Sequence, residues 1–449
     1  MGLGMIALIV FVAVTIVWFA ALRRDIAEAL LVAFLATAVC GGWQAPQLVL
    51  DGVVAAATSE VLFAAMAFVV MSQVTTTTGL VGRLAEILNS LFGRLPGGAG
   101  YVSTLASALF GLVSGSGAGN AATVGTITVP WMKQSNWRPR ESALIVTGNA
   151  GLGIALPPSS TMFILLAAPG VSGVTIDQVL VPLLAAGCVT LVYRLAVVAF
   201  LARRYRVRAL SGDLVPPLRQ TLRAGWTSGI IFLGVAVPLL LTVGPVANAL
   251  RAVDSVGDDG VDAISIIIWV PVLITVFALV EGRRRLPRGW SGLHRMVLDG
   301  RQSLAAVGGS VFFALAASDV LARLGLDRDL SSMLSGLDLP KSVLVLVVCS
   351  LLVLVASPLS STSTVATIGG VAFVALTGAG LPPVLAFVII LIATSTEGAS
   401  PPGAAALFIA AGLAKVDPSR IFLPAVVYYV APIIVIAWLL GMGFIPIPL

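Results

Sequence analysis

The chain has 449 residues, of which 58% are hydrophobic and 10% are charged, and its mean hydropathy is +1.06. Soluble domains carry about 25% charged residues, so this composition excludes a soluble globular protein and predicts a polytopic protein of the lipid bilayer. The formal net charge of +6 does not indicate binding to nucleic acid. The basic residues form short clusters between apolar runs, as topogenic signals do.

About ten apolar stretches reach the roughly 20 residues that a helix needs to cross a bilayer. We therefore predict an all-α membrane protein with crossings at residues 3–22, 26–41, 61–78, 141–168, 179–201, 225–243, 262–280, 302–321, 383–413 and 421–441. Two further apolar stretches, 101–130 and 341–377, have polar middles. We expect each of them to form a re-entrant hairpin, which enters the membrane, turns and leaves on the same side.

A short segment ahead of the first hairpin has the pattern of an amphipathic helix. Leucine and isoleucine recur at helical spacing between residues 80 and 91, while Arg83, Glu86 and Asn89 share the other side. This pattern predicts a helix that lies on the membrane surface, with an ordinary tight loop as the alternative. A related segment, residues 322–340, precedes the second hairpin.

The basic clusters predict the orientation of the chain, because Lys and Arg in short loops are held on the cytoplasmic side. If neither hairpin crosses, the main clusters share one face, and both termini lie outside. The two hairpins then start from opposite faces, which predicts an inverted-topology repeat. The resulting regions are N-terminal scaffold helices at 1–60, a first repeat unit at 61–201, connecting scaffold helices at 202–301 and a second repeat unit at 302–449.

Polar segments with helix-breaking residues interrupt the apolar sequence in two pairs. The first pair is Ser114-Gly-Ser-Gly-Ala-Gly-Asn120 and Pro157-Pro-Ser-Ser160, and the second is Ser357-Pro-Leu-Ser-Ser-Thr362 and Ser400-Pro-Pro-Gly403. Within each pair, the two segments begin 43 positions apart. In hydrocarbon, the backbone groups freed by a break must meet protein, water or a ligand, so the duplicated breaks indicate the binding site of a transporter.

The first polar segment, residues 114–120, suits a cation. Its three glycines and two serines form a poor helix but leave carbonyls, hydroxyls and the Asn120 amide for a partly dehydrated ion, and sodium is the natural candidate. The helix that follows can turn its N-terminal amides toward an anionic substrate. A close helix crossing mediated by the glycines is the alternative.

The segment around Pro157 and Pro158 must break its helix, because two adjacent prolines remove two backbone donors. Ser159, Ser160 and Thr161 then open the second half-helix, where they can cap it or contact a ligand. A purely structural kink is the alternative reading of this break.

The second unit repeats these features and adds a carboxylate, Glu397. A carboxylate near mid-membrane must be paired, protonated or bound to a cation, so Glu397 either ligates sodium or carries a coupled proton. Hydrogen bonding to nearby hydroxyls in a water-filled cavity is the open alternative.

Arg194 lies in an apolar span near a basic cluster, and we expect its long side chain to extend to the interface. Contact with substrate is the alternative for Arg194.

The chain lacks the residues of a motor or an enzyme. None of its lysines, Lys133, Lys341 and Lys415, ends a Gly-rich phosphate-binding loop, which argues against a nucleotide motor. The single His294 supplies neither a two-His zinc site nor a Ser-His triad. We therefore expect no catalysis and no cofactor, and energy from an ion gradient, with the proton as the alternative to sodium.

Several motifs occur in an order that resembles a known family. They are Phe92-Gly-Arg-Leu-Pro-Gly-Gly98, Gly111-Leu-Val-Ser-Gly-Ser-Gly117, Gly125-Thr-Ile-Thr-Val-Pro130, Pro157-Pro-Ser159 and Ser400-Pro-Pro402. From about residue 61 onward the chain resembles the large membrane subunit of tripartite ATP-independent periplasmic (TRAP) transporters, the C4-dicarboxylate permease type of the ion transporter superfamily. The resemblance implies sodium-driven import of carboxylates across a bacterial or archaeal inner membrane, with periplasmic termini. It also implies elevator movement, a small membrane subunit and a periplasmic substrate-binding protein.

The resemblance also assigns site residues. The implied sodium contacts are Ser114, Gly115, Ser116, Asn120, Gly148 and Asn149 in the first unit, and the second hairpin tip at Ser357 with Thr394, Thr396 and Gly398 in the second. Glu397 is added as a sodium contact by the argument on its mid-membrane carboxylate, not by the resemblance. The expected contacts of the organic anion, between the hairpin tips, are Ser116, Pro158, Ser159, Ser160, Ser360, Ser361, Thr362, Ser400 and Pro401. The chain departs from the family pattern at Glu397, where the family has glycine, and in the dense Ser/Thr run at 357–364.

Two other functions stay open from the sequence. A self-sufficient anion/sodium symporter or exporter of the same superfamily needs no binding protein. A membrane scaffold or receptor that transports nothing is the remaining alternative, although it has no use for duplicated polar breaks.

Overall fold

The computed structural model is helical throughout the part of the chain that it describes, and no strand occurs there. The described residues are 2–18, 22, 24–114, 117–210, 215–242, 245–253, 257, 260, 266–283, 286, 290–326, 329, 340–357, 361–401 and 404–449. The predicted all-α class is confirmed. The surface segment predicted ahead of the second hairpin lies largely outside the described residues.

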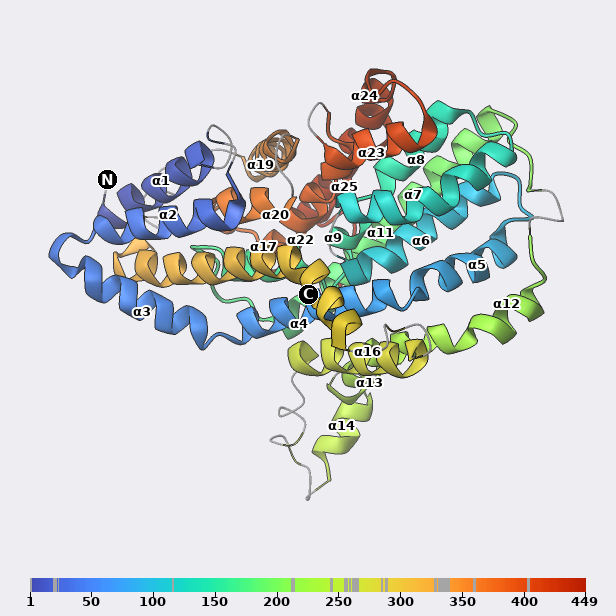
Figure 1. The fold of residues 1–449 in the computed structure, drawn as a ribbon. Coiled ribbons are helices and arrows are strands. Elements are labelled where there is room, and N and C mark those ends of the chain that lie inside the picture. Colours follow the sequence, from blue (N-terminus) through green and yellow to red (C-terminus); the bar gives the residue numbers. More distant parts are fainter. Residues whose placement is uncertain are drawn as a thin grey trace.

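One end of the molecule is a layer of helices packed around a single long helix, α17 (Figure 1). Its members are α1 (Leu3–Ile16), α2 (Ile26–Val39), α3 (Ala45–Ala57), α4 (Glu60–Thr77) and α17 (Trp290–Arg323). At Gly52, α3 approaches α17 so closely that a Cβ atom would lie 2.8 Å from the carbonyl oxygen of Ala316. Arg323 of α17 joins the same two helices through an ion pair to Asp51 of α3 at 2.9 Å, and it also pairs with Asp319 of its own helix at 2.7 Å.

The other end holds the first hairpin and the first half of the first broken helix. Its elements are α5 (Leu80–Phe92), α6 (Gly98–Ser114), α7 (Gly117–Gln134), α8 (Pro139–Asn149), α9 (Leu152–Ala155) and α11 (Ile176–Arg204). The second half of the broken helix, α10 (Ser160–Ala167), packs against α4 and α17. The predicted helix at 80–91 is present as α5. The break predicted at the proline pair is also confirmed, because the helix Pro139–Ala155 and α10 meet at an angle of 50°.

A third group of helices connects these halves along the chain. It comprises α12 (Leu218–Gly225), the 3-10 helix η4 (Trp226–Phe232), α13 (Leu233–Thr242), α14 (Pro245–Arg251) and α16 (Ile266–Gly282). Glu281 of α16 forms an ion pair with Arg83 of α5 and accepts hydrogen bonds from Thr227 and Ser228, each at 3.1 Å. The segment predicted as a crossing at 225–243 is helical from Trp226 to Thr242, with η4 followed directly by α13, and whether it crosses the membrane stays a prediction.

The last third of the chain contains the second pair of interrupted helices. Its elements are α19 (Lys341–Ala356), α20 (Ser361–Thr364), the π-helix η5 (Val365–Gly369), α21 (Gly370–Gly378), α22 (Pro383–Thr394), the 3-10 helix η6 (Glu397–Ala399), α23 (Ala405–Ala414), α24 (Ser419–Ala425), the π-helix η7 (Val426–Val430) and α25 (Ala431–Gly441). Every residue of α22 from Leu385 to Thr394 is buried. This helix is therefore the centre of the molecule.

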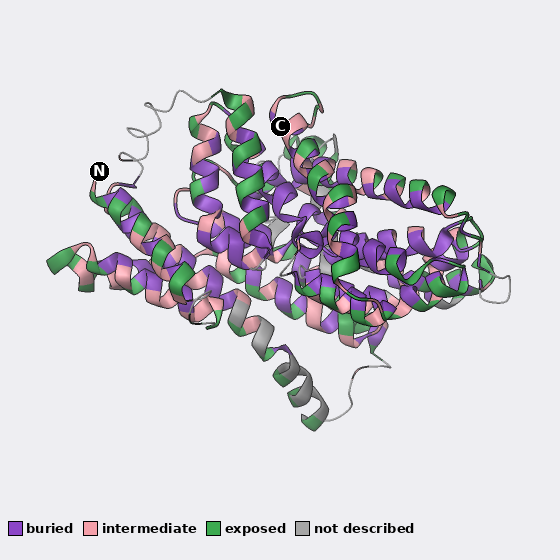
Figure 2. Cartoon of the chain, turned by 90° about the horizontal axis from the view of Figure 1, so that it is seen from above, coloured by how far each residue is buried: buried purple, intermediate pink, exposed green. Residues whose placement is uncertain are grey.

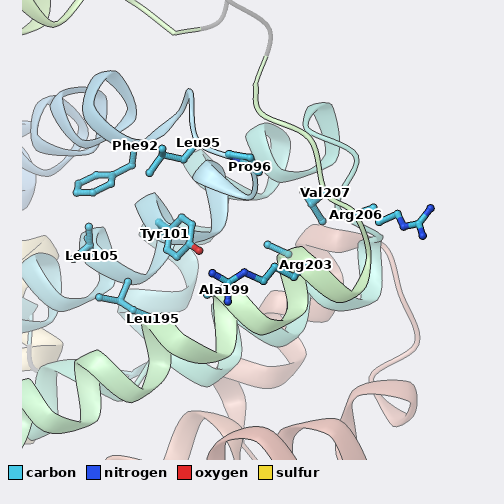
Figure 3. Close-up of a pocket in the computed structure, with 11 residues that line it drawn as sticks. Phe92, Leu95, Pro96, Tyr101, Leu105, Leu195, Ala199, Arg203, Arg206 and Val207 are labelled. Carbon is cyan, nitrogen blue, oxygen red and sulfur yellow. The ribbon is translucent and has the colours of Figure 1, made fainter.

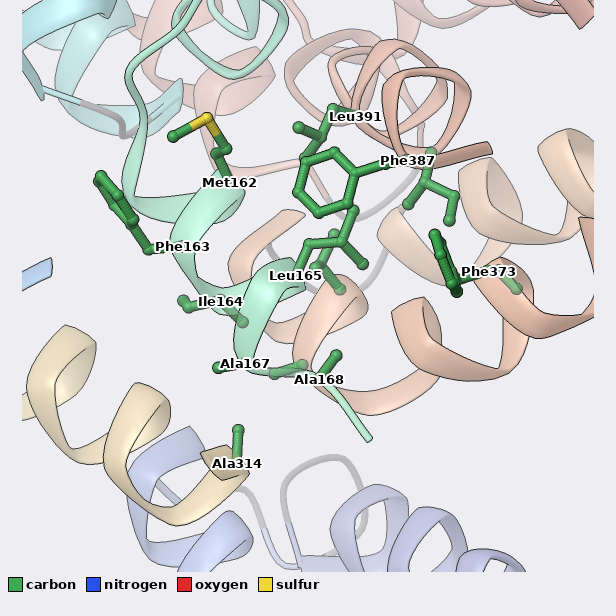
Figure 4. Close-up of a cluster of buried hydrophobic side chains, with 14 of the residues drawn as sticks. Met162, Phe163, Ile164, Leu165, Ala167, Ala168, Ala314, Phe373, Phe387 and Leu391 are labelled. Atoms are coloured by element: carbon green, nitrogen blue, oxygen red, sulfur yellow. The ribbon is translucent and has the colours of Figure 1, made fainter. Parts of the chain in front are cut away.

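Apolar packing fixes α22 against the second half of the first broken helix. Phe387 and Leu391 of α22 lie beside Met162 and Leu165 of α10 in one buried cluster (Figure 4). Figure 2 shows the same pattern for the described residues, with buried residues gathered inside and exposed residues along the outer faces of peripheral helices. The two broken helices thus share one apolar core.

The lengths of the described helices test only some of the predicted crossings. Four described helices are long and apolar enough to cross a membrane, namely Glu60–Thr77, Ile176–Arg204, Ser361–Gly378 and Ser419–Gly441, and the bent pair Pro139–Ala155 with Ser160–Ala167 makes a fifth. The crossing predicted at 3–22 contains α1, which ends at Ile16, and its length stays a prediction because residues 19–21 lie outside the described residues. The number of crossings, the inverted repeat and the region boundaries stay predictions.

Candidate functional site

The two broken helices meet at their breaks. A Cβ atom at Gly151, in the first break, would lie 1.9 Å from the carbonyl oxygen of Ser395 in the second. Close by, the hydroxyl of Thr147 donates to the carbonyl oxygen of Gly398. Only glycine lets the backbones at residue 151 and residue 395 touch, so these segments, 244 positions apart in the sequence, form one junction.

Arg194 of α11 binds both sides of this junction. Its guanidinium donates to the carbonyl oxygen of Gly148 at 2.8 Å, to the hydroxyl of Ser395 at 3.2 Å and to the carbonyl oxygen of Ser395 at 3.4 Å. The side chain is fully buried, with 0% exposed. The expectation that Arg194 extends to the interface is therefore wrong.

The position of Arg194 has a clear electrostatic cause. Gly148 lies in the last turn of α8 and Ser395 caps the end of α22, where helices leave carbonyl oxygens without intrahelical partners. Both helix C-termini carry partial negative charge, which favours a cation beside them. In the described part of the chain no carboxylate pairs with Arg194, so the two helix ends supply its compensating charge.

Two buried asparagines, Asn120 and Asn149, flank the first break. The Asn120 amide group donates to the carbonyl oxygens of Ser107 at 2.9 Å and Ala150 at 3.1 Å. The Asn149 amide group donates to the hydroxyl of Thr104 and to the carbonyl oxygen of Ile145, each at 2.8 Å. These bonds fix the orientation of both side chains.

The Oδ1 atoms of Asn120 and Asn149 are buried, and each lacks a hydrogen-bond partner in the described structure. A buried acceptor left unpaired costs about 1 to 3 kcal/mol, so such atoms call for an ion or a water molecule. Amide and carbonyl oxygens are hard ligands that suit a small cation without adding charge. The structure thus brings predicted sodium contacts together at the first break.

At the second break, Glu397 holds the tip of the second hairpin. Its Oε2 atom accepts a hydrogen bond from the backbone N–H of Ser361 at 3.0 Å, at the start of the helix Ser361–Gly378. A carboxylate at a helix N-terminus is stabilised by the helix dipole. On its other side lies Gly117 of the first hairpin, where a Cβ atom would be 3.5 Å from Oε1. Glu397 therefore lies between the two hairpins.

Ser357 makes the second attachment of this hairpin tip. Its hydroxyl donates to the carbonyl oxygen of Ser400 at 3.1 Å and to that of Pro401 at 2.5 Å. Ser357 and Ser400 are the residues that the sequence pattern places 43 positions apart, and they are directly bonded. The carbonyls freed at Ser400 and Pro401 are thus satisfied by the hairpin.

The hydroxyls of several predicted contacts bond within their own segment. The hydroxyls of Thr394 and Thr396 donate to carbonyl oxygens of Ile390 and Ala393, each at 2.8 Å, and Ser400 donates to Thr396 at 3.0 Å. Ser159 accepts from the N–H of Met162 at 3.2 Å, which confirms its predicted role as the cap of α10. Pro158 is buried there, while Ser160 and Thr362 are half-buried.

Three predicted site residues, Gly115, Ser116 and Ser360, lie outside the described residues, as does the side chain of Ser114. Sequence reasoning missed Thr104, Ser107 and Thr147, although polar residues spaced along α6 and α8 were a usable signal. It named Thr161 as a possible cap or ligand contact but did not assign it to the substrate site. This buried hydroxyl has no hydrogen-bond partner within the described segments, at the first turn of α10.

Comparison with known proteins places the chain in a family. A family model described as the DctM component of the tripartite ATP-independent periplasmic transporter matches residues 5–446. The chain is 29% identical over 126 residues to the 2,3-diketo-L-gulonate TRAP transporter large permease protein YiaN of Escherichia coli K12, which covers 28% of this chain and 30% of the relative. It is 37% identical over 93 residues to the C4-dicarboxylate TRAP transporter large permease protein DctM of Pseudomonas aeruginosa, covering 21% and 22%. The aligned segments thus span less than a third of either relative.

Among solved structures, the fold is similar to MtrF of Neisseria gonorrhoeae, which is described as illuminating a class of antimetabolite efflux pumps. The TM-score is 0.65 at 14% identity, and the match covers 88% of this chain and 83% of that one. At this identity the likeness concerns the fold alone.

Proposed function

Because the chain belongs to the family of tripartite ATP-independent periplasmic transporters, as a DctM component, we propose that it is the large permease subunit of a sodium-coupled importer of small organic anions. It is a multi-pass membrane protein of a transporter family. Carboxylates are the proposed substrate class, because the names of the two relatives give a gulonate and a C4-dicarboxylate as the substrates of those proteins. The proposed location is the inner membrane, with both termini on the periplasmic side.

The observation that carries the proposal is the junction of the two breaks. Unwound carbonyls and half-helix C-termini are the groups that bind coupling ions in transporters with broken helices. At the first break, the buried Oδ1 atoms of Asn120 and Asn149 add oxygen ligands with unused acceptor capacity. Sodium at this place, with Ser114, Gly115 and Ser116 as further ligands, satisfies acceptors that are otherwise unpaired.

The N-terminus of α10 is the proposed binding site of the substrate carboxylate. Helix N-termini bind anions through free N–H groups and the dipole, and Thr161 adds a buried hydroxyl there. The other N-terminus, at Ser361, already has the Glu397 carboxylate on its first N–H. The two half-helices are therefore assigned different partners, the substrate at α10 and Glu397 at Ser361, with Ser360, Thr362, Ser400 and Pro401 completing the substrate site.

The proposed cycle is an elevator movement in which both broken helices travel together. The bonds of Arg194 to Gly148 and Ser395 support a single moving body, because they join the two breaks. A small membrane subunit and a periplasmic binding protein are the proposed partners. A self-sufficient anion/sodium symporter or exporter that needs no binding protein is the second candidate.

Uptake into proteoliposomes tests the import proposal. We expect labelled carboxylates to enter only with an inward sodium gradient and only when the small subunit and a binding protein are supplied. Uptake without the binding protein favours the self-sufficient transporter. If uptake follows a proton gradient and Glu397→Gln abolishes it, the coupling ion is the proton, carried by Glu397, and not sodium.

A further inference from the structure

A cavity of about 630 Å³ lies between the C-terminal end of α5, the first turns of α6 and the last turns of α11 (Figure 3). It opens on a different face of α11 from the one that carries Arg194, so it is separate from the junction of the breaks. No residue of the sodium or substrate sites proposed above lines it.

The cavity has an apolar floor and a basic rim. Phe92, Leu105 and Leu195 form the floor, and Arg203 and Arg206 lie at the other end. Since an α-helix rises 1.5 Å per residue, Leu195 lies about 12 Å below Arg203 along α11. Figure 3 shows the Tyr101 hydroxyl on the side of Arg203, while the Arg206 head group extends outward. This depth and polarity suit an acyl chain whose head group stays at the rim.

Arg206 occupies a backbone position that usually belongs to glycine. Its φ is 50°, and the N–H of Val207 donates to the carbonyl oxygen of Ala202 at 2.9 Å, as in the helix-ending motif with a left-handed residue. An arginine there is strained relative to glycine. The Arg206 side chain therefore has a function that compensates for the strain of its left-handed backbone conformation.

The surrounding charge is complementary to an anion. Arg203 and Arg206 line the cavity, and Arg94 and Arg208 belong to the two segments that border it. Basic pockets between membrane helices bind anionic lipid head groups, and each arginine near the surface contributes about 1 kcal/mol. We propose that this cavity binds an anionic phospholipid, with one acyl chain on the apolar floor and the phosphate at Arg203 and Arg206.

The cavity lies where a bound lipid contacts helices of different parts of the fold. One wall belongs to α5, which is tied to the connecting helices through Arg83 and Glu281, and the other walls belong to α6 and α11. A bound acyl chain fills the seam between these elements. The lipid is expected to stabilise the folded chain against heat.

The test measures lipid binding to the purified chain by native mass spectrometry and by the midpoint of thermal unfolding. We expect saturable binding of phosphatidylglycerol and at least tenfold weaker binding of phosphatidylcholine with the same acyl chains. Arg203→Gln with Arg206→Gln is expected to weaken phosphatidylglycerol binding more than tenfold. Arg204→Gln, an exposed neighbour that does not line the cavity, is expected to change it less than twofold.

Two further variants test the binding of the lipid head group and of its acyl chain separately. Arg206→Gly removes a charge while relieving the left-handed backbone, so it is expected to fold as well as the wild type and to bind the lipid about fivefold more weakly. Ala199→Phe fills the cavity with both rim arginines in place, and it is expected to abolish lipid binding. Equal binding of both lipids, equal stabilisation by inorganic phosphate, or an equal loss in Arg204→Gln overturns the proposal.

Discussion

Arg194 donates a hydrogen bond of 2.8 Å to the carbonyl oxygen of Gly148, where the first broken helix ends its first half. The same guanidinium reaches Ser395 at the end of α22. One cation thus lies at the C-termini of two helices from different thirds of the chain. Its planar fork of donors makes this double contact possible, and a lysine cannot reproduce it.

Replacing Arg194 by methionine is expected to lower the free energy of unfolding by about 2 to 4 kcal/mol. Hydrogen bonds to a charged group contribute about 1.5 to 3 kcal/mol each, and part of this is offset because a buried charge disappears. Arg194→Lys is expected to recover less than half of the loss. Thermal unfolding in detergent measures both, with exposed Arg204→Gln of the same helix as control. If Arg194→Met unfolds at the wild-type temperature, the double contact does not hold the junction.

Gly151→Ala is expected to separate the two breaks. Its Cβ atom has no room beside the carbonyl oxygen of Ser395, and such overpacking costs about 1 to 3 kcal/mol. Gly82→Ala is the matched control, because nothing lies within 4 Å of its Cβ position in α5 and alanine favours helix. Uptake assays should find transport lost in the first variant and kept in the second. Full transport by Gly151→Ala contradicts a direct contact of the breaks.

Asn149→Ala is expected to weaken sodium binding by more than tenfold, since it removes a buried oxygen with no other partner among the described residues. The measurement is the sodium concentration that half-maximally raises the unfolding temperature. Thr128→Val serves as control, because it removes a buried hydrogen bond of 3.1 Å to Ser103 between the hairpin helices without touching the amide oxygens. Equal sodium responses in both variants remove Asn149 from the ion site.

Glu397→Gln is expected to keep the fold and most of the sodium-driven uptake. Glutamine still accepts from the N–H of Ser361, and the lost charge at a helix N-terminus is worth about 0.3 to 1 kcal/mol. Glu397→Ala removes the acceptor as well, so its unfolding temperature should fall further. The proton alternative is tested by the pH dependence of uptake. If wild-type uptake follows the proton gradient and Glu397→Gln does not transport at any pH, Glu397 is a proton carrier.

The sequence was sufficient for the features that depend on local chemistry. The proline pair at 157 and 158 predicted the bend between α9 and α10, and the spacing of Leu80 to Leu91 predicted α5. Helix α3 was missed because its 13 residues are too few for a search based on crossings. The start of α17 at Trp290, ahead of the predicted 302, was missed because charged residues there lower the local hydropathy.

The role of Arg194 depends on tertiary structure. Its partners lie 46 and 201 positions away, and their carbonyls are free only because two other helices end beside it. Distance from a basic loop, the one clue within its own segment, pointed to the interface instead. The contacts of Glu397 also depend on tertiary structure, because Ser361 and Gly117 come from two different hairpins.

Binding of radioactive sodium to the purified chain tests most directly whether the two breaks form one ion site. The account predicts saturable binding to the wild type, to Gly82→Ala and to Thr128→Val, and at least tenfold weaker binding to Asn149→Ala and Gly151→Ala. Sodium binding that is equal in all five proteins, or absent from the wild type, contradicts it.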